Sequence, residues 1–360
     1  MIKKHRWVFL GITVCAVTFF YVEDYFKAPQ KSAYYYEKLQ AANLAAKAMA
    51  TLKEEIIRKH IPSDSINDPN ATYLVGTKYS VITENQQSLT EVLIALNPNF
   101  SAAIVEMFSE LKLVKGDIVA LNVTGSFPGL NIGVLSACEI MKLDPVIITA
   151  VSSTSFGANN PEFTWLDMEM LLYQKGIFSN KTIAASLGGE NDNGEGISPD
   201  GRILLLRAIE RNNTQLINST SLADNIGERF KIISNYAMSK NKKISVYIDV
   251  GGTITGFGQS VHDTLVKAGI NKYPEQQFFS NYGLIQRMTE NRIPIIFLGD
   301  IAGLARARGL TIAVVPQPLP GEDELFYKEK YSVKLAIFFL VCLMGLLFLY
   351  IRIEIYLKRK

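Results

Sequence analysis

The sequence has 360 residues, of which 48% are hydrophobic, and a formal net charge of +3. Much of its basic excess flanks two apolar runs near the ends of the sequence, and the body between them carries a net charge of about −4, which excludes nucleic acid as an expected partner. Cys138 is the only cysteine outside the apolar runs, so a disulfide within the body is excluded, and the sequence has no His or Cys spacing typical of a zinc site.

The first apolar run covers residues 7–22 and carries no charge. As a helix it would reach roughly 24 Å, slightly less than a bilayer core. Basic residues precede it and acidic residues follow it, at Lys3, Lys4, Arg6, Glu23 and Asp24. This asymmetry predicts an uncleaved transmembrane helix, with residues 1–6 as a cytoplasmic tail and the body outside the cytoplasm. A cleaved signal peptide fits less well because the small-x-small cleavage pattern is absent.

The second apolar run covers residues 335–351, and the basic tail 352–360 follows it. The run has no polar face, which favours a second transmembrane helix over a buried core helix. We therefore expect a two-pass protein of the cytoplasmic (inner) membrane, with both termini in the cytoplasm. The inverted topology, with a cytoplasmic body, is the alternative.

The body is expected to begin with a helical part, residues 23–115. The spacing of apolar residues over 32–61 predicts a long helix that ends before Pro62. Three shorter elements should follow: a strand at 79–83 and helices at 88–96 and 100–113.

From residue 116 to 331 the pattern changes to short apolar runs that alternate with helical segments. The predicted strands are 118–123, 146–151, 182–187, 244–250, 294–298 and 311–315. The predicted helices are 130–141, 162–173, 199–211, 221–239, 261–267, 282–290 and 302–306. Near-continuous apolar strands are typical of parallel sheets buried on both faces. The alternation predicts a doubly wound, mostly parallel α/β domain that binds ligands at the C-terminal ends of its strands.

Two of the predicted strand ends resemble each other in the pattern Asx-Val-x-Gly-Ser/Thr-x-x-Gly. The first contains Asn122, Thr124, Gly125, Ser126 and Gly129, and the second contains Asp249, Gly251, Gly252, Thr253 and Gly256. A third strand end adds Ser152 and Ser153. Glycine allows close approach of the backbone, and a following helix presents unpaired N–H groups, so these residues are predicted to bind phosphate or carboxylate. Ordinary tight turns recruit the same residue types, which is the competing interpretation.

The second loop also resembles the Asp-x-Gly-Gly-Thr phosphate loop of actin-like ATPases and sugar kinases. In those proteins the turn joins a hairpin, whereas here a helix is expected to follow. A nucleotide at Asp249 to Thr253 would also require a cytoplasmic body. The sequence has no Gly-Lys-Ser/Thr phosphate loop.

The sequence has no complete motif for calcium binding or for hydrolysis by a serine. The acidic stretch 188–196 has oxygen ligands of the kind that calcium prefers but no EF-hand spacing, so a solvated loop or a lid over a ligand is expected there instead. A hydrolase would need His262 with Ser126 or Ser152 as nucleophile and Asp249 or Asp263 as orienting residue, without a Gly-x-Ser-x-Gly motif. We expect no cofactor and no metal, and a binding role rather than an enzyme.

The two-anchor layout, residues 116–131 and the Tyr247-Ile-Asp-Val-Gly-Gly-Thr segment together resemble the bacterial poly-gamma-glutamate system protein family, over nearly the whole chain. The resemblance implies an accessory membrane protein of poly-gamma-glutamate synthesis or export. Its external body would contact the polymer through carboxylate binding, or contact the synthase subunits. The alternative is a gamma-glutamyl hydrolase or transferase that acts on the polymer. The resemblance assigns no catalytic residue.

Overall fold

The computed structural model describes residues 2–258, 266–272 and 283–359, with side chains except at residues 2–6, 8 and 357–359. The chain divides into two compact units. Ala33–Phe326 form the body, whereas Met1–Ser32 and Tyr327–Lys360 together form the terminal unit. The helical segment and the α/β segment therefore belong to the same compact body.

The body is built on a seven-stranded sheet with the order β5-β4-β3-β2-β6-β8-β7. Its neighbouring strands are parallel, except that β7 runs antiparallel to β8. The strands are β2 (Ile118–Thr124), β3 (Asp144–Ala150), β4 (Ala184–Ser186), β5 (Gln215–Ile217), β6 (Ile244–Val250), β7 (Gly269–Asn271) and β8 (Ile295–Leu298). Every residue of β2 is buried, which explains its uninterrupted apolar sequence.

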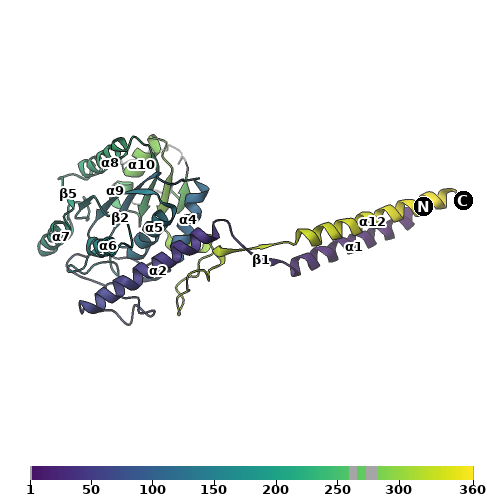
Figure 1. Cartoon of the computed structure of the whole chain (residues 1–360), viewed down its shortest axis with the longest axis horizontal. Coiled ribbons are helices and arrows are strands. Elements are labelled where there is room, and N and C mark those ends of the chain that lie inside the picture. The colour runs from purple at the N-terminus through teal and green to yellow at the C-terminus, as the bar shows by residue number, and fades with distance from the viewer. Residues whose placement is uncertain (1, 259–265, 273–282, 360) are drawn as a thin grey trace. The chain divides into compact units, whose positions relative to one another are not determined.

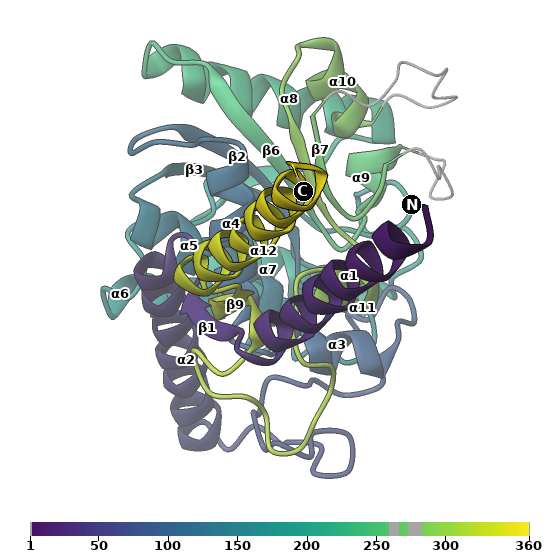
Figure 2. The same cartoon turned by 90° about the vertical axis from the view of Figure 1, so that its right-hand side faces the viewer.

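Helices cover both faces of this sheet (Figure 2). On one face α5 (Pro128–Met141) packs with α2 (Tyr35–Arg58) and α4 (Phe100–Glu110) over strand residues such as Val119 and Leu121. On the other face α8 (Leu222–Ser239) and α10 (Leu284–Glu290) pack over Ile118 and Ala120. The remaining helices of the body are α3 (Leu89–Ala95), α6 (Trp165–Gln174), α7 (Pro199–Arg211), α9 (Ile254–Phe257), α11 (Ile301–Ala307) and the 3₁₀ turn Glu324–Phe326. The predicted α/β class with a mostly parallel sheet is confirmed.

The terminal unit is a pair of helices joined to a two-stranded ribbon. It consists of α1 (Ile2–Tyr25), β1 (Ala28–Lys31), β9 (Tyr327–Lys330) and α12 (Val333–Arg359). β1 and β9 pair antiparallel, and α1 and α12 lie side by side (Figure 1). The ring of Phe19 stacks on that of Phe339 with 4.2 Å between centroids.

Among the described residues, one helix is long and apolar enough to cross a membrane by length and composition, at Val333–Tyr356. The N-terminal helix does not meet this criterion over its described residues. The bent pair α3 and α4 would meet it only as one broken span, and its apolar residues belong to the core of the body.

Several predicted elements differ from those observed. Residues 311–315 do not form a strand, because Thr311 N and Oγ1 bind the carboxylate of Asp323 and Ala313 has a positive φ of 42°. Residues 79–83 contribute only an isolated bridge between Thr83 and Ser153. The predicted helix 261–267 falls largely outside the described residues.

Strands β5 and β7 were not predicted. Each has three residues and forms an edge of the sheet, so neither shows the long apolar run by which a buried strand is recognised.

Candidate functional site

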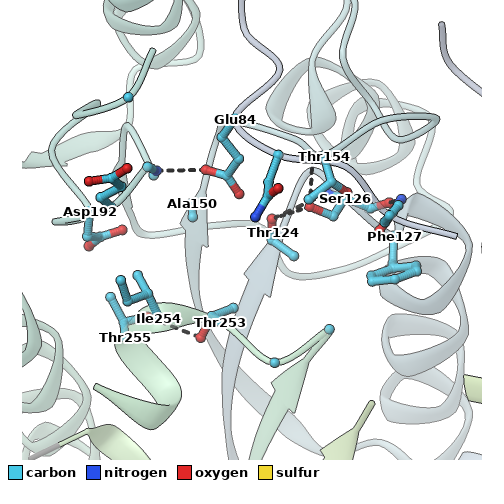
Figure 3. Close-up of a pocket in the computed structure, with 18 of the residues that line it drawn as sticks. Glu84, Thr124, Ser126, Phe127, Ala150, Thr154, Asp192, Thr253, Ile254 and Thr255 are labelled. Atoms are coloured by element: carbon cyan, nitrogen blue, oxygen red, sulfur yellow. Dashed lines mark hydrogen bonds between the residues drawn. The ribbon is translucent and has the colours of Figure 1, made fainter. Parts of the chain in front are cut away.

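A cavity of about 620 Å³ lies at the C-terminal edge of the sheet, beside the ends of β2, β3 and β6. The chain leaves β2 for β3, β4 and β5 on one side and returns to β6 on the other side of β2. Open α/β sheets commonly bind ligands where the strand order reverses in this way. The walls come mainly from residues 84–91, 124–127, 188–196 and 251–255. Figure 3 shows the loops after β2 and β6 facing each other across this space.

The loop after β2 presents hydroxyl groups and the first residues of α5. The Ser126 hydroxyl accepts a hydrogen bond from Thr154 N at 3.1 Å and pairs with Thr124 Oγ1 at 3.1 Å. Gln87 Nε2 donates to the carbonyl of Ser126 at 3.0 Å. Pro128 is the first residue of α5, and the fixed φ of proline suits the first turn of a helix. The side chains of this loop are therefore held in place before any ligand arrives.

The loop after β6 presents its backbone. Gly251 and Gly252 have φ values of 85° and 74°, a region that side chains with a Cβ rarely adopt. Thr253 then caps α9 by accepting from Gly256 N at 2.9 Å. Asp249 accepts from Thr253 N at 3.0 Å and from Thr253 Oγ1 at 2.7 Å, so its carboxylate organises its own loop. Burial raises the pKa of Asp249, although these hydrogen bonds oppose the shift.

A buried polar network joins the two loops behind the cavity. Asn122 Nδ2 lies 3.0 Å from Asp249 Oδ2 and 2.7 Å from Thr253 Oγ1. Arg229 of α8, which is fully buried, donates to Asn122 Oδ1 at 2.8 Å. The same guanidinium binds both carboxylate oxygens of Asp192 at 3.0 Å. Such a bidentate pair fixes the orientation of the guanidinium and the carboxylate as well as their separation. Through Arg229 and Asn122, the 188–196 loop is therefore linked to the ends of both β2 and β6.

This ion pair corrects the interpretation of 188–196 as a solvated loop. Asp192 is 1% exposed, and Ser186 donates to its carboxylate. Asn225 Nδ2 of α8 also donates to Asn191 O at 2.9 Å. The exposed carboxylates of Glu190 and Glu195 remain beside the cavity. The loop thus lines the cavity and is fixed to the body at Asp192. The described residues contain no group of three or more His, Cys, Asp or Glu side chains that could hold a metal ion.

Glu84 forms the wall opposite the loop after β6. Its Oε2 accepts from Gly189 N at 2.7 Å and from the hydroxyl of Ser152, and the other carboxylate oxygen points into the space (Figure 3). Burial raises the pKa of Glu84, whereas its two hydrogen bonds act in the opposite direction. The half-buried Glu84 is the carboxylate best placed to meet a ligand.

The twelve residues predicted to bind a ligand divide into two groups. Thr124, Ser126, Gly251, Gly252 and Thr253 line the cavity. The others do not line it and serve the local structure: Asn122, Gly125, Gly129, Ser152, Ser153, Asp249 and Gly256. Gly129, for example, lets α5 approach α3, because a Cβ there would lie 2.3 Å from Ala95 O.

The charge of the lining differs from that expected for an anion site. Five acidic residues line the cavity: Glu84, Glu91, Glu190, Asp192 and Glu195. No Lys, Arg or His lines it among the described residues, and Arg229 is already paired with Asp192. A carboxylate or phosphate here would meet only uncharged donors from the described part of the chain, which are backbone N–H groups, hydroxyls and side-chain amides, and would face carboxylates across the cavity. A cation would find several.

The arrangement offers little for hydrolysis by a serine. Ser152 is fully buried and donates to Glu84, so it does not reach the cavity. Ser126 reaches it but has no histidine beside it among the described residues. His262 and Asp263 lie outside the described residues, so the predicted triad is not placed.

Sequence reasoning missed four residues that shape the site: Glu84, Gln87, Glu91 and Arg229. The first three lie in or next to the polar segment before α3, far from any strand end in the sequence. Arg229 lies within an amphipathic helix, where an arginine usually faces solvent. None of the four lies in a sequence motif that is typical of a binding site. Comparisons of the chain with protein-family models, with curated proteins and with solved structures found no match.

Proposed function

We propose that this protein is a membrane-anchored binding protein whose body holds a small polar ligand with a positively charged amino group. The observation that carries the proposal is the lining of the strand-end cavity, which has five acidic residues and no basic one among the described residues. An ammonium group donates three hydrogen bonds and accepts none, so it suits carboxylate, hydroxyl and carbonyl oxygens together. Thr124, Ser126 and Glu84 supply such oxygens.

The terminal unit supports a two-span anchor. α1 and α12 run beside each other over much of their length, as the Phe9–Tyr350 ring contact at 5.8 Å and the Phe19–Phe339 stack indicate. Large apolar side chains of α12, such as Phe338, Val341 and Met344, are exposed and available to lipid. With basic residues at the outer ends of both helices, we propose that both termini are cytoplasmic and that the body is extracytoplasmic.

The resemblance to poly-gamma-glutamate system proteins supplies the setting that we propose, an accessory role in synthesis or export of the polymer beside the synthase subunits. The acidic cavity does not favour the polymer's many carboxylates. The amino end of a gamma-glutamyl chain is the part of the polymer that suits it. The cavity would therefore bind the amino end of the polymer instead of its carboxylates.

The side of the membrane can be measured by labelling. Cys138 is buried and unsuitable as a reporter, so Ser239→Cys, at an exposed position at the end of α8, is made in a Cys138→Ser background. An impermeant maleimide should label it in intact cells from which the outer wall has been removed. Labelling only after lysis would place the body in the cytoplasm and overturn the proposed topology.

Ligand chemistry is tested by isothermal titration of the full-length protein in detergent with n-butylamine, 1-butanol and butyrate at equal ionic strength. We expect measurable binding of the amine only, weakened about tenfold by Glu84→Gln and unchanged by Glu210→Gln, an exposed control on α7. Affinity for the amine should also fall as the pH is lowered, because protonation of Glu84 removes its charge and its pKa is raised. Butyrate binding without amine binding would overturn the proposal.

The link to the polymer needs a separate probe. Gamma-linked glutamate oligomers with a free amino end should bind, and the same oligomers with an acetylated amino end should not. Equal binding of both forms would show that the amino end is not what the cavity recognises.

A further inference from the structure

A second, smaller cavity of about 220 Å³ adjoins the first. The two cavities share four lining residues, Glu91, Phe127, Gly251 and Gly252. A ligand in one therefore lies against a wall of the other. The lining of the second cavity combines three aromatic rings with two carboxylates, a composition that the first cavity does not have.

The rings come from three separate segments of the body. Phe127 precedes α5, Phe257 ends α9, and Phe297 lies on β8. Phe257 and Phe297 meet edge to face, with 5.0 Å between centroids and 73° between ring planes. A Cβ at Gly299 would lie 2.2 Å from the ring of Phe297, so glycine at this position is what lets the ring lie against the backbone. The aromatic walls are thus held by packing rather than by a ligand.

The carboxylates are Glu91 of α3 and Asp300 before α11. Asp300 has φ 41° and caps α11 by accepting from Gly303 N at 3.1 Å, which leaves it exposed at the mouth of the cavity. Burial raises the pKa of Glu91, and the like charge of Asp300 raises it further. Neither residue forms an ion pair with another described residue. Two like charges beside aromatic faces attract an organic cation, because each ring face is also negative.

We propose that the second cavity is a subsite for an alkylammonium group, and that the ligand of the body is a linear diamine with one ammonium group in each cavity. One ammonium lies between Glu91 and Asp300 against the rings of Phe257 and Phe297. The other lies beside Glu84 in the larger cavity, and the alkyl chain between them passes Phe127 and the glycine backbone. This inference rests on the proposed amine-binding function and narrows it to a class of ligand.

The test uses the full-length protein in detergent and isothermal titration with 1,4-diaminobutane and n-butylamine, which differ only in the second amino group. We expect the diamine to bind at least about tenfold more tightly, since a second charged hydrogen-bonded contact contributes roughly that factor. Glu91→Gln and Asp300→Asn should each reduce this preference to about threefold or less. Both keep the shape of the side chain, and asparagine tolerates the left-handed backbone and still caps the helix.

Two further variants separate the subsite from general effects on the fold. Phe297→Leu should weaken the diamine and n-butylamine unequally, with the diamine affected more. Glu210→Gln should leave both affinities unchanged. Thermal melting without ligand establishes that each variant is folded.

The outcomes distinguish the two proposals. If n-butylamine binds as tightly as the diamine and Glu91→Gln and Asp300→Asn change nothing, the second subsite is wrong while amine binding stands. If neither amine binds the wild-type protein, the proposed function fails and the subsite fails with it.

Discussion

The loops after β2 and β6 share one spacing of Asx, glycine and hydroxyl residues but use it differently. In the loop after β2, the glycines serve packing: a Cβ at Gly125 would lie 2.8 Å from Ser152 O, and Gly129 lies against α3. In the loop after β6, Gly251 and Gly252 have positive φ and line the cavity. The helices also differ, since α5 has 14 residues and α9 has four. Similar spacing at two strand ends therefore does not mean two equivalent binding sites.

The two strand ends are nevertheless linked, because Asn122 of β2 donates to Asp249 of β6 and to Thr253 of the loop after β6. Arg229 holds this junction and Asp192 together. Variants can break the junction or test the different roles of the two loops.

The largest effect is expected for Arg229→Met. The substitution leaves Asp192 buried without its partner and removes a donor from Asn122, which should cost about 3–5 kcal/mol in the free energy of unfolding. Urea denaturation of the full-length protein in detergent, followed by tryptophan fluorescence, measures it. Arg207→Met, at an exposed position on α7, is the control and should change the value by less than about 0.5 kcal/mol. A similar loss in both variants would contradict the structural role of the network.

A smaller effect is expected for glycine substitutions, and it should differ between the loops. Gly129→Ala places a Cβ 2.3 Å from a backbone oxygen, so the helices must move apart at a cost of about 2 kcal/mol. Gly252→Ala meets no atom closer than 3.5 Å and costs only the backbone strain of about 1 kcal/mol.

Ligand binding should show the reverse order for these two variants. Gly252→Ala adds a methyl group to the cavity wall and should weaken amine binding, whereas folded Gly129→Ala should bind normally. Titration of both with n-butylamine is the measurement. Normal binding by Gly252→Ala would remove this glycine from the site.

Effects of about the same size as that of Gly252→Ala are expected when the hydroxyl of Thr253 or of Ser126 is removed. Thr253→Ala removes the cap of α9 and a donor to Asp249, and should cost about 1–2 kcal/mol. Ser126→Ala leaves Thr154 N without its acceptor and should cost about 1 kcal/mol. Thermal melting of both variants, with Ser239→Ala as an exposed control, checks the order. If Ser126→Ala destabilises the protein more than Thr253→Ala does, the loop after β2 contributes more to stability than the loop after β6.

Much of the sheet was predictable because a strand buried on both faces leaves a continuous apolar run. β2, β6 and the helix α7 were found within one residue of their ends. The three-residue edge strands β5 and β7 carry no such run. Residues 311–315 also form an apolar run, but four of the five are exposed. Thr311 donates to Asp323, and Val314 O accepts from Asn70 Nδ2, so neither group bonds to a neighbouring strand. An apolar run therefore does not by itself establish a buried strand, because its residues can be exposed and its backbone can bond to side chains instead.

The sequence pointed to two loops that line the cavity, but not to the acidic residues that face them. Strand ends followed by glycine located the loops after β2 and β6, and both contribute to the cavity. Glu84 and Glu91 could not be found, because a tertiary contact and not local sequence brings the segment before α3 to the end of β3. The anion prediction therefore considered the loops without the acidic wall that faces them.

The pairing of β1 with β9 also has a consequence in time. Tyr331 bonds to Asp24, 307 residues away in the chain, so the segment that pairs with β1 and packs against α1 is synthesised only after the whole body. α1 must exist without its neighbour while the entire body is synthesised. Contacts this distant in sequence close slowly and at an entropic cost, and folding of the body shortens the effective distance between the two strands. Pairing of α1 with α12 therefore cannot precede synthesis of the body that separates them in the chain.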